Sequence, residues 1–265
     1  MKKQNKTSIK HDQHFLINQS YAIEIINLLN LEEDDIIIEI GPGNGALSNH
    51  LKNNKHFLVE IDENLSQILK ERNYNVINEN FLKINNTFLE ENHINKLISN
   101  LPYSISEPFV FKILKMYEEK KDKNFKGVLM VGESFYYIIK GNFSMYADFF
   151  QAFFQIKDEI LVKPENFNPP PSVDSYVFCF ENKKEITDDM KISMYLYDCF
   201  KKKLKITSIV RNYFWNELNL TKRESKEKSN IFLDKKKEEF KNKQLDNLNV
   251  FEYFEIKDFL FKNKD

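Results

Sequence analysis

The stretch SNLPY, residues 99–103, places an amide, a proline and a phenol side by side at the end of a short apolar run. Asn100 and the backbone carbonyl of Leu101 can accept hydrogen bonds from an exocyclic amine. Pro102 fixes the turn and removes a competing donor, and Tyr103 can stack on a planar base. Such groups can aim the lone pair of an amine at an electrophile, and this positioning needs no catalytic histidine or cysteine.

A second set of candidate residues lies in IIIEIGPGNGALS, residues 36–48. Gly41, Gly43 and Gly45 follow a predicted strand and precede a predicted helix, so the backbone can turn sharply and approach a ligand without a Cβ in the way. Glu60 ends the next apolar run, where a carboxylate can accept hydrogen bonds from ribose hydroxyls. This pattern predicts a nucleotide-type site but does not by itself name the ligand.

Both sets belong to a series of short apolar runs that alternate with amphipathic, helix-like stretches. Strands that alternate with helices indicate a parallel sheet covered on both faces. The last two runs are joined by KPENFNPPPSVD, which is too short for a crossover helix, so the final strand should pair antiparallel. The predicted fold is an α/β sheet of seven strands at 35–40, 56–61, 75–77, 96–99, 127–131, 159–162 and 175–180.

After Phe180 the sequence becomes polar and then Lys-rich with helical spacing, and no further strong strand pattern follows. We therefore expect two domains, residues 1–182 with the sheet and residues 183–265 as a small all-α domain.

Composition favours a protein of the cytosol that does not cross a membrane. No apolar run approaches the ~20 residues that span a bilayer. The two cysteines, Cys179 and Cys199, cannot build a disulfide framework and lack the spacing of a metal site, so we expect neither. The net charge of −1 hides basic ends, because residues 1–10 and 183–265 both carry a positive excess while the middle is acidic. Such ends could bind a polyanion, although solvated charge would give the same pattern.

Several motifs together resemble one family. The GPGNG loop resembles the S-adenosylmethionine (SAM) site of class I methyltransferases, and NLPY resembles the [N/D/S]-P-P-[Y/F] motif of amino methyltransferases. QHFL (13–16) and FNPPPSVDSYV (167–177) resemble two further blocks of the ribosomal RNA adenine N6-dimethyltransferases, the family of KsgA-type and Erm enzymes. The similarity runs in order from about residue 10 to 180 and implies a Rossmann-like, SAM-dependent methyltransferase domain.

This resemblance also implies roles for individual residues. Asn100, Leu101, Pro102 and Tyr103 would form the catalytic motif, and Phe167 would clamp a flipped adenine opposite Tyr103. The SAM site would comprise His14, Leu16, Gly41, Gly43, Gly45, Glu60, Asn80 and Asn100.

At Asn80 the chain departs from the family, which usually has an aspartate there to hold the SAM adenine amino group. A neutral amide should bind that group more weakly than a charged carboxylate does.

The resemblance favours a KsgA-type enzyme, which dimethylates two adjacent adenosines near the 3′ end of small-subunit rRNA during ribosome biogenesis. An Erm-type enzyme acting on large-subunit rRNA remains an alternative. So does a non-catalytic RNA-binding assembly or transcription factor on the same fold. The intact glycine loop and NLPY argue against the binder, and the QHFL block argues against other class I amino methyltransferases. The expected partner is ribosomal RNA in an immature small subunit, the expected compartment the cytoplasm, and the expected state a monomer.

RNA binding is predicted for the basic C-terminal region. Residues 201–243 hold 14 Lys and Arg against 6 acids, and basic groups of this kind bind phosphates without reading sequence. Trp215 is predicted to lie in the core of the helical domain rather than to stack on RNA. The predicted RNA-binding residues are Lys201, Lys202, Lys203, Lys205 and Arg211.

Overall fold

The structure is a computed structural model that describes residues 13–51, 54–101, 106–120 and 124–264. The chain forms two compact units. The first combines the residues up to Lys140 with Phe154–Asn182, and the second combines Gly141–Phe153 with the residues from Lys183 onward. The helical unit therefore includes a segment, Gly141–Phe153, that lies inside the predicted 1–182 domain.

The first unit is built on a seven-stranded sheet with the order β4-β3-β2-β5-β6-β9-β7. Strands β2 to β6 pair in parallel, and β9 pairs antiparallel with both of its neighbours. This topology confirms the predicted Rossmann-like sheet with an antiparallel last strand. The strands are β2 (Ile36–Ile40), β3 (Lys55–Glu60), β4 (Val76–Asn78), β5 (Lys96–Asn100), β6 (Lys126–Gly132), β7 (Phe154–Val162) and β9 (Ser175–Asn182).

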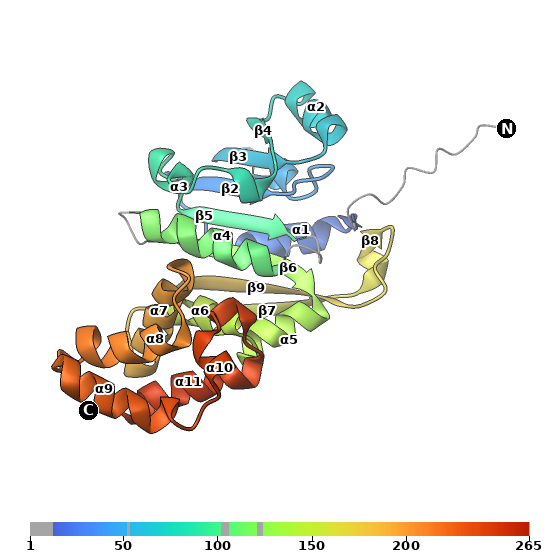
Figure 1. Ribbon diagram of the computed structural model, residues 1–265. Helices are drawn as coiled ribbons and strands as arrows, with labels where there is room; N and C mark the ends of the chain where they lie inside the picture. The colour runs from blue at the N-terminus through green and yellow to red at the C-terminus, as the bar shows by residue number, and fades with distance from the viewer. Residues whose placement is uncertain (1–12, 52–53, 102–105, 121–123, 265) are drawn as a thin grey trace. The chain divides into compact units, whose positions relative to one another are not determined.

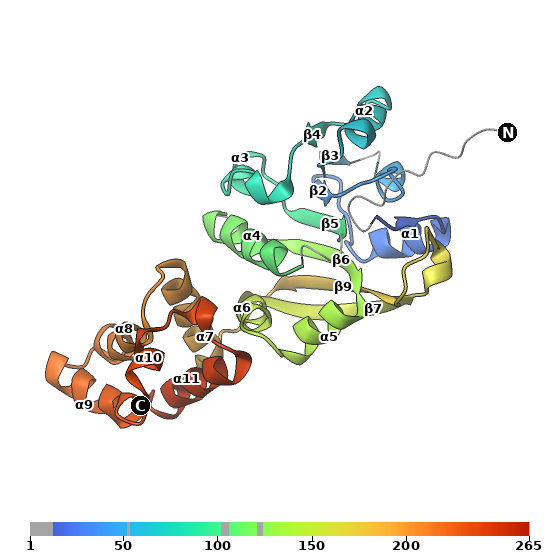
Figure 2. The same cartoon turned by 45° about the vertical axis from the view of Figure 1, so that its right-hand side comes forward.

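Apolar side chains on both faces of these strands explain why helices cover both faces. Helix α1 (Gln19–Asn27) packs on one face, where Ile25 and Ile26 join the cluster that contains Ile98 and Val128. Figures 1 and 2 show α4 (Ser106–Glu119) on the opposite face from α1.

The remaining helices of this unit are short. Asp62 caps the start of α2 by accepting the N–H groups of Asn64 and Leu65, as expected for an aspartate at an N-cap. The other elements are α2 (Glu63–Glu71), α3 (Phe88–Glu91), α5 (Glu133–Gly141) and the 3₁₀ turns η1 (Ser48–His50), η2 (Phe81–Lys83) and η4 (Pro164–Asn166).

The helix predicted directly after the glycine loop is not an α-helix. This segment forms turns from Gly43 to Leu47 and then the 3₁₀ turn η1. Serine and asparagine side chains compete with helical backbone hydrogen bonds, and SNHLKNN follows Leu47, so the sequence gives little support to a longer helix.

Two segments far apart in the sequence pair as a separate two-stranded sheet. Phe15 and Leu16 of β1 (Phe15–Leu16) lie opposite Asn168 and Phe167 of β8 (Phe167–Asn168), in antiparallel register. This pairing joins QHFL to the proline-rich loop.

The second unit is helical, as the Lys-rich composition and helical spacing of residues 183–265 predicted. Its core includes Phe149, whose ring contacts that of Tyr197 at a tilt and that of Tyr253 edge-on. The elements are α6 (Met145–Phe153), α7 (Asp188–Lys201), α8 (Ile206–Asn212), the π-helical turn η5 (Tyr213–Glu217), α9 (Lys222–Leu233), α10 (Glu238–Asn242), the 3₁₀ turn η6 (Leu245–Asn247) and α11 (Val250–Lys262). Cys179 in the first unit and Cys199 in the second are both buried and free.

Candidate active site

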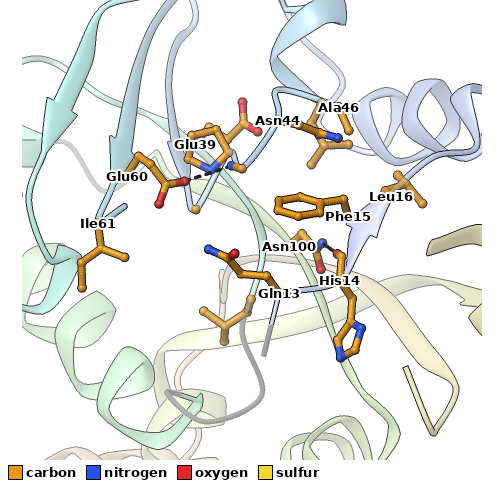
Figure 3. A pocket seen from close by; sticks show the side chains of 15 residues that line it. Gln13, His14, Phe15, Leu16, Glu39, Asn44, Ala46, Glu60, Ile61 and Asn100 are labelled. Atoms are coloured by element: carbon orange, nitrogen blue, oxygen red, sulfur yellow. Dashed lines mark hydrogen bonds between the residues drawn. The ribbon is translucent and has the colours of Figure 1, made fainter. Parts of the chain in front are cut away.

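A pocket opens at the carboxyl ends of β2, β3 and β5, the edge at which open α/β sheets bind ligands. Its empty volume is about 770 Å³, open space at the mouth included. Figure 3 shows its side chains converging from the glycine loop, from the N-terminal segment and from the end of β5. The lining residues are Gln13, His14, Phe15, Leu16, Glu39, Gly41, Pro42, Gly43, Asn44, Ala46, Leu47, Glu60, Ile61, Asn100 and Leu101.

The glycine loop has the backbone that its sequence predicts. Gly41, Gly43 and Gly45 all have positive φ, at 65°, 56° and 83°, where a side chain would be strained. A Cβ on Gly43 would lie 2.8 Å from the ring of Phe15, so only glycine lets these two segments approach so closely. Gly41 and Gly43 line the pocket, whereas Gly45 packs near Leu69 instead.

Glu60 lies at the end of β3, in the predicted place, and is buried. One carboxylate oxygen accepts the N–H of Gly43 at 3.0 Å and the other accepts the N–H of Asp62 at 2.9 Å. These bonds hold the carboxylate against the glycine loop (Figure 3). Burial raises the pKa of Glu60 above its usual value, and the two backbone hydrogen bonds work against that rise.

Glu39, which was not among the predicted site residues, also lines the pocket. It is the last acidic residue before the glycine loop and is 1% exposed. The hydroxyl of Ser48 donates to Glu39 Oε2 at 2.6 Å. Burial raises the pKa of Glu39 to about 7, the Ser48 hydrogen bond opposes this, and the nearby Glu60 adds to it. Its position next to the loop is the sequence signal that could have identified it.

Asn100 ends β5 and lines the same pocket. Its Nδ2 donates to the backbone carbonyl of His14 at 2.9 Å, which fixes the amide plane (Figure 3). Among the described residues its Oδ1 has no hydrogen-bond partner, so this oxygen can accept from a ligand. The N–H of Leu101 donates to the carbonyl of Met130 at 2.9 Å and ties the motif to β6. Pro102 and Tyr103 lie outside the described residues.

The N-terminal segment closes one side of the pocket. Leu16 is buried, and Nδ1 of His14 lies 2.9 Å from the carbonyl oxygen of Pro169, to which it can donate a hydrogen bond. Figure 3 shows that the His14 ring points away from Glu60, while the ring of Phe15 lies between the glycine loop and Asn100. Phe15 is therefore another lining residue that the predicted set omitted, although it lies within the QHFL block.

Besides Gly45, two further predicted residues are absent from the pocket lining. Phe167 is 3% exposed and packs in the hydrophobic cluster with Leu16 and Val177, so a clamp on adenine would require its ring to leave that cluster. Asn80 does not line the pocket. Its Oδ1 accepts the N–H of Leu82 at 2.9 Å and caps the turn η2. Their roles at the site stay predictions.

The chemistry of the lining indicates the charge of the ligand. Two buried carboxylates, Glu39 and Glu60, face the pocket, and none of its described lining residues is a lysine or arginine. Such a lining disfavours a pyrophosphate and favours a cation with hydroxyls that can donate to Glu60. SAM fits this description, since it carries a sulfonium, an ammonium group and a ribose.

The predicted RNA-binding residues all lie in the second unit, but they differ in their partners. Lys201 pairs with Asp198 at 2.8 Å and Lys203 pairs with Asp246 at 2.5 Å. Lys205 donates to Asn242 at 3.1 Å. The other two, Lys202 and Arg211, are exposed and have no ion pair within the described part of the chain.

The prediction that Trp215 lies in the core is wrong. Its side chain is 45% exposed, while its neighbours Tyr213 and Phe214 are buried. The reason is the π-helical turn η5, because i→i+5 bonding changes which residues face inward relative to an α-helix.

Among the described residues no group of three or more His, Cys, Asp or Glu side chains could hold a metal ion. Within the same residues no helix has both the length and the apolar composition required to cross a bilayer.

Comparison with known proteins gives consistent matches. A family model described as ribosomal RNA adenine dimethylase matches residues 4–258. The chain is 36% identical over 227 residues to the ribosomal RNA small subunit methyltransferase A of Malacoplasma penetrans, covering 80% of this chain and 81% of the relative. It is 31% identical over 270 residues to a probable protein of the same name from Methanococcoides burtonii, covering 95% and 93%.

Solved structures support the fold. A dimethyladenosine transferase from Plasmodium falciparum aligns with a TM-score of 0.61 at 23% identity, over 92% of this chain and 96% of that one. The 23S rRNA methyltransferase ErmE aligns with a TM-score of 0.55 at 17% identity, over 93% and 99%. With a family match over nearly its whole length, the chain belongs to the ribosomal RNA adenine dimethylase family.

Proposed function

We propose that this protein is a SAM-dependent adenine N6-dimethyltransferase that acts on small-subunit ribosomal RNA. The observation that carries the proposal is the convergence of the glycine loop, Glu60 and Asn100 on one acidic pocket in a chain of this family. The relatives named as small subunit methyltransferases favour this substrate over large-subunit rRNA.

The pocket residues would bind and orient the cofactor. SAM, when bound, supplies an electrophilic methyl group on its sulfonium. Glu60, held by Gly43 and Asp62, keeps free lone pairs with which to accept from ribose hydroxyls. Glu39 adds negative charge to the wall of the pocket, and ionised carboxylates stabilise a bound cation.

The end of β5 would orient the target amine. The Oδ1 of Asn100 and the carbonyl of Leu101 would accept the two N–H groups of the adenine N6 atom and so direct its lone pair toward the methyl group. The bond from Asn100 to His14 and the bond from Leu101 to Met130 preorganise both acceptors. Because the amine loses its proton only after transfer, orientation supplies most of the rate enhancement. The predicted roles of Tyr103, Phe167 and Asn80 belong to the same proposal.

Ribosomal RNA would be held partly by the second unit. Of the predicted basic residues, Lys202 and Arg211 are the strongest candidates because no described acid neutralises them, whereas Lys201, Lys203 and Lys205 already have partners. With the immature small ribosomal subunit as its partner, the enzyme would act in the cytoplasm as a monomer.

Methyl transfer from labelled SAM to undermethylated small subunits tests the proposal, with large-subunit RNA as a second substrate. We expect dimethyladenosine in small-subunit RNA for the wild type. We expect a loss of about a hundredfold or more in the rate for Asn100→Ala, within the range for a group that orients and stabilises a transition state.

Two outcomes would contradict the proposal. Label only in large-subunit RNA would assign an Erm-type activity. SAM or RNA binding with no transfer to either substrate would assign a binding protein without catalysis. Asn85→Ala, which removes an asparagine outside the pocket lining, serves as the control and should transfer at the wild-type rate.

A further inference from the structure

A second pocket lies on the surface of the helical unit, between α9 and the α8–η5 segment that packs against it. Its empty volume is about 570 Å³, open space included. The lining is Arg211, Asn212, Trp215, Lys222, Ser225 and Lys226. The pocket is therefore made of one large aromatic ring, polar groups and three cations.

The aromatic member, Trp215, is 45% exposed although it is one of the largest apolar side chains a protein can bury. The π-turn η5 presents it on the surface, and π-turns of this kind occur often at functional sites. The ammonium of Lys222 lies 5.1 Å from the centroid of the ring, so a positive charge accompanies the exposed indole.

The polar member, Ser225, supplies an independent sign of a ligand. It is 3% exposed, it lines the pocket, and its hydroxyl has no hydrogen-bond partner among the described residues. A buried hydroxyl without a partner carries a free-energy cost that a ligand could remove.

The cations of the pocket are not neutralised by the acids near them. Arg211, Lys222 and Lys226 have no ion pair within the described ranges, and the ammonium of Lys222 lies over the ring of Trp215. The neighbouring acids are engaged elsewhere, because Glu224 completes the capping box with Thr221 and Glu227 pairs with Arg223 at 2.9 Å.

We propose that this pocket binds an unpaired nucleotide of RNA, with the base stacked on Trp215 and the phosphate held by Arg211 and Lys226. The ring supplies a stacking surface that any base can use, and the two cations supply the phosphate contacts. The hydroxyl of Ser225 hydrogen-bonds to the edge or the sugar of the same nucleotide. The choice of RNA as the ligand rests on the proposed function, and the pocket adds a contact to RNA in the unit that does not hold the methyl-transfer pocket.

The chain offers a direct readout, because Trp215 is its only tryptophan. The full-length protein is titrated with a short single-stranded oligoadenylate while tryptophan fluorescence is recorded. Anisotropy of labelled RNA gives the affinity in parallel. We expect saturable quenching, and we expect Trp215→Ala to weaken the affinity for the oligoadenylate about tenfold, as loss of one stacking contact would.

Further variants separate binding from folding. Trp215→Phe keeps an aromatic ring and should bind within about twofold of the wild type, since phenylalanine also stacks on bases. Ser225→Ala and Lys226→Ala should each reduce the quenching observed at a fixed concentration of RNA. Phe251→Ala removes another aromatic side chain of the same unit, one that is 83% exposed, and should leave the affinity unchanged.

Three results would contradict the proposal that this pocket binds a nucleotide of RNA. These are RNA binding without any change of fluorescence, equal affinities for Trp215→Ala and wild type, and quenching by a polyglutamate peptide at lower concentration than by RNA. Methyl transfer is measured on the same preparations. Methyl transfer without quenching would contradict nucleotide binding at Trp215 but support the methyltransferase function. Quenching without methyl transfer would support nucleotide binding at Trp215 but contradict the methyltransferase function.

Discussion

Two buried carboxylates, one in each unit, are held in opposite ways. Asp148 in the helical unit is 2% exposed and accepts from Lys257 at 2.6 Å and from the hydroxyl of Tyr253 at 2.6 Å. Glu39 in the sheet unit is 1% exposed, but it accepts from the hydroxyl of Ser48 and no cation pairs with it among the described residues.

The contrast indicates what each carboxylate is for. A buried charge that is paired and fully hydrogen-bonded is part of the internal structure of its unit. A buried carboxylate without a cation keeps a raised pKa, and Glu39 lies on the wall of the pocket that we assign to a cationic ligand. The same chemical group thus serves packing in one unit and recognition in the other.

The strongest test of the contrast is Lys257→Met. Removing the ammonium leaves Asp148 buried with only neutral donors, and breaking a buried pair in this way costs about 3–5 kcal/mol in the free energy of unfolding. Urea unfolding followed by circular dichroism measures the change.

Lys264→Met is the matched control for Lys257→Met, because Lys264 pairs with the half-exposed Asp188 at the surface. An exposed pair contributes about 1 kcal/mol or less. Equal losses for the two variants would show that the buried pair has no special weight.

The second test is the pH dependence of Glu39→Gln. The pKa of this carboxyl is 4.5 in the unfolded chain and about 7 in the folded one. As the pH rises between these values the unfolded chain releases a proton that the folded chain retains, so wild-type stability falls and the penalty is complete above pH 7. A glutamine side chain cannot ionise, and the variant should therefore gain up to about 3 kcal/mol over the wild type at about pH 8 and nothing at about pH 4. Urea unfolding at the two pH values measures the difference.

The affinity of the wild type for SAM should rise over the pH range in which its stability falls. For the wild type it should rise as the pH passes through about 7, since the ionised form of Glu39 is the better partner for a cation. In Glu39→Gln it should be weaker above pH 7 and nearly independent of pH there. Isothermal titration calorimetry across the range decides this, and a wild-type affinity that stays constant would remove Glu39 from the cofactor site.

The two units also differ in how well the sequence predicted them. The apolar periodicity of the sequence predicted the sheet, and the short last loop predicted its antiparallel final strand. The glycines and Glu60 predicted that a ligand site lies at the carboxyl edge of the sheet. Gly41 and Gly43 adopt positive φ because their own sequence allows it, and Glu60 lies at the end of its strand. Such features depend on a few neighbouring residues, which is why a motif can specify them.

Other features depend on contacts that no short motif encodes. Trp215 became exposed through a π-turn. The segment 141–153 packs with the helical unit because Asp148 pairs with Lys257, more than a hundred residues away. Tertiary packing decided these positions, and local propensity could not.

The third test compares two glycines of the loop, to separate the effect of a new side chain next to Phe15 from the effect of strain at positive φ. Gly43→Ala and Gly45→Ala both place a side chain at positive φ, but only the first directs a Cβ toward Phe15, at 2.8 Å. The ring of Phe15 would have to move within the pocket, and overpacking of this kind costs about 1–3 kcal/mol. SAM affinity should therefore fall about tenfold or more for Gly43→Ala relative to Gly45→Ala. Equal calorimetric affinities would mean that the ring does not border the cofactor.

The smallest expected effect compares two lysines of the helical unit. Lys202 is exposed with no ion pair in the described chain, whereas Lys203 is paired with Asp246. If Lys202 neutralises an RNA phosphate, Lys202→Ala should reduce the slope of log affinity against log salt by about one, because one fewer counterion is released. Lys203→Ala should reduce that slope by less, since the bound ammonium must first give up its carboxylate. Neither change should alter SAM affinity, because neither residue lines the pocket. Equal slopes for the two variants would show that RNA breaks the surface pair between Lys203 and Asp246. The ion pairs of the free protein would then not identify which lysines of this unit contact phosphates in the complex.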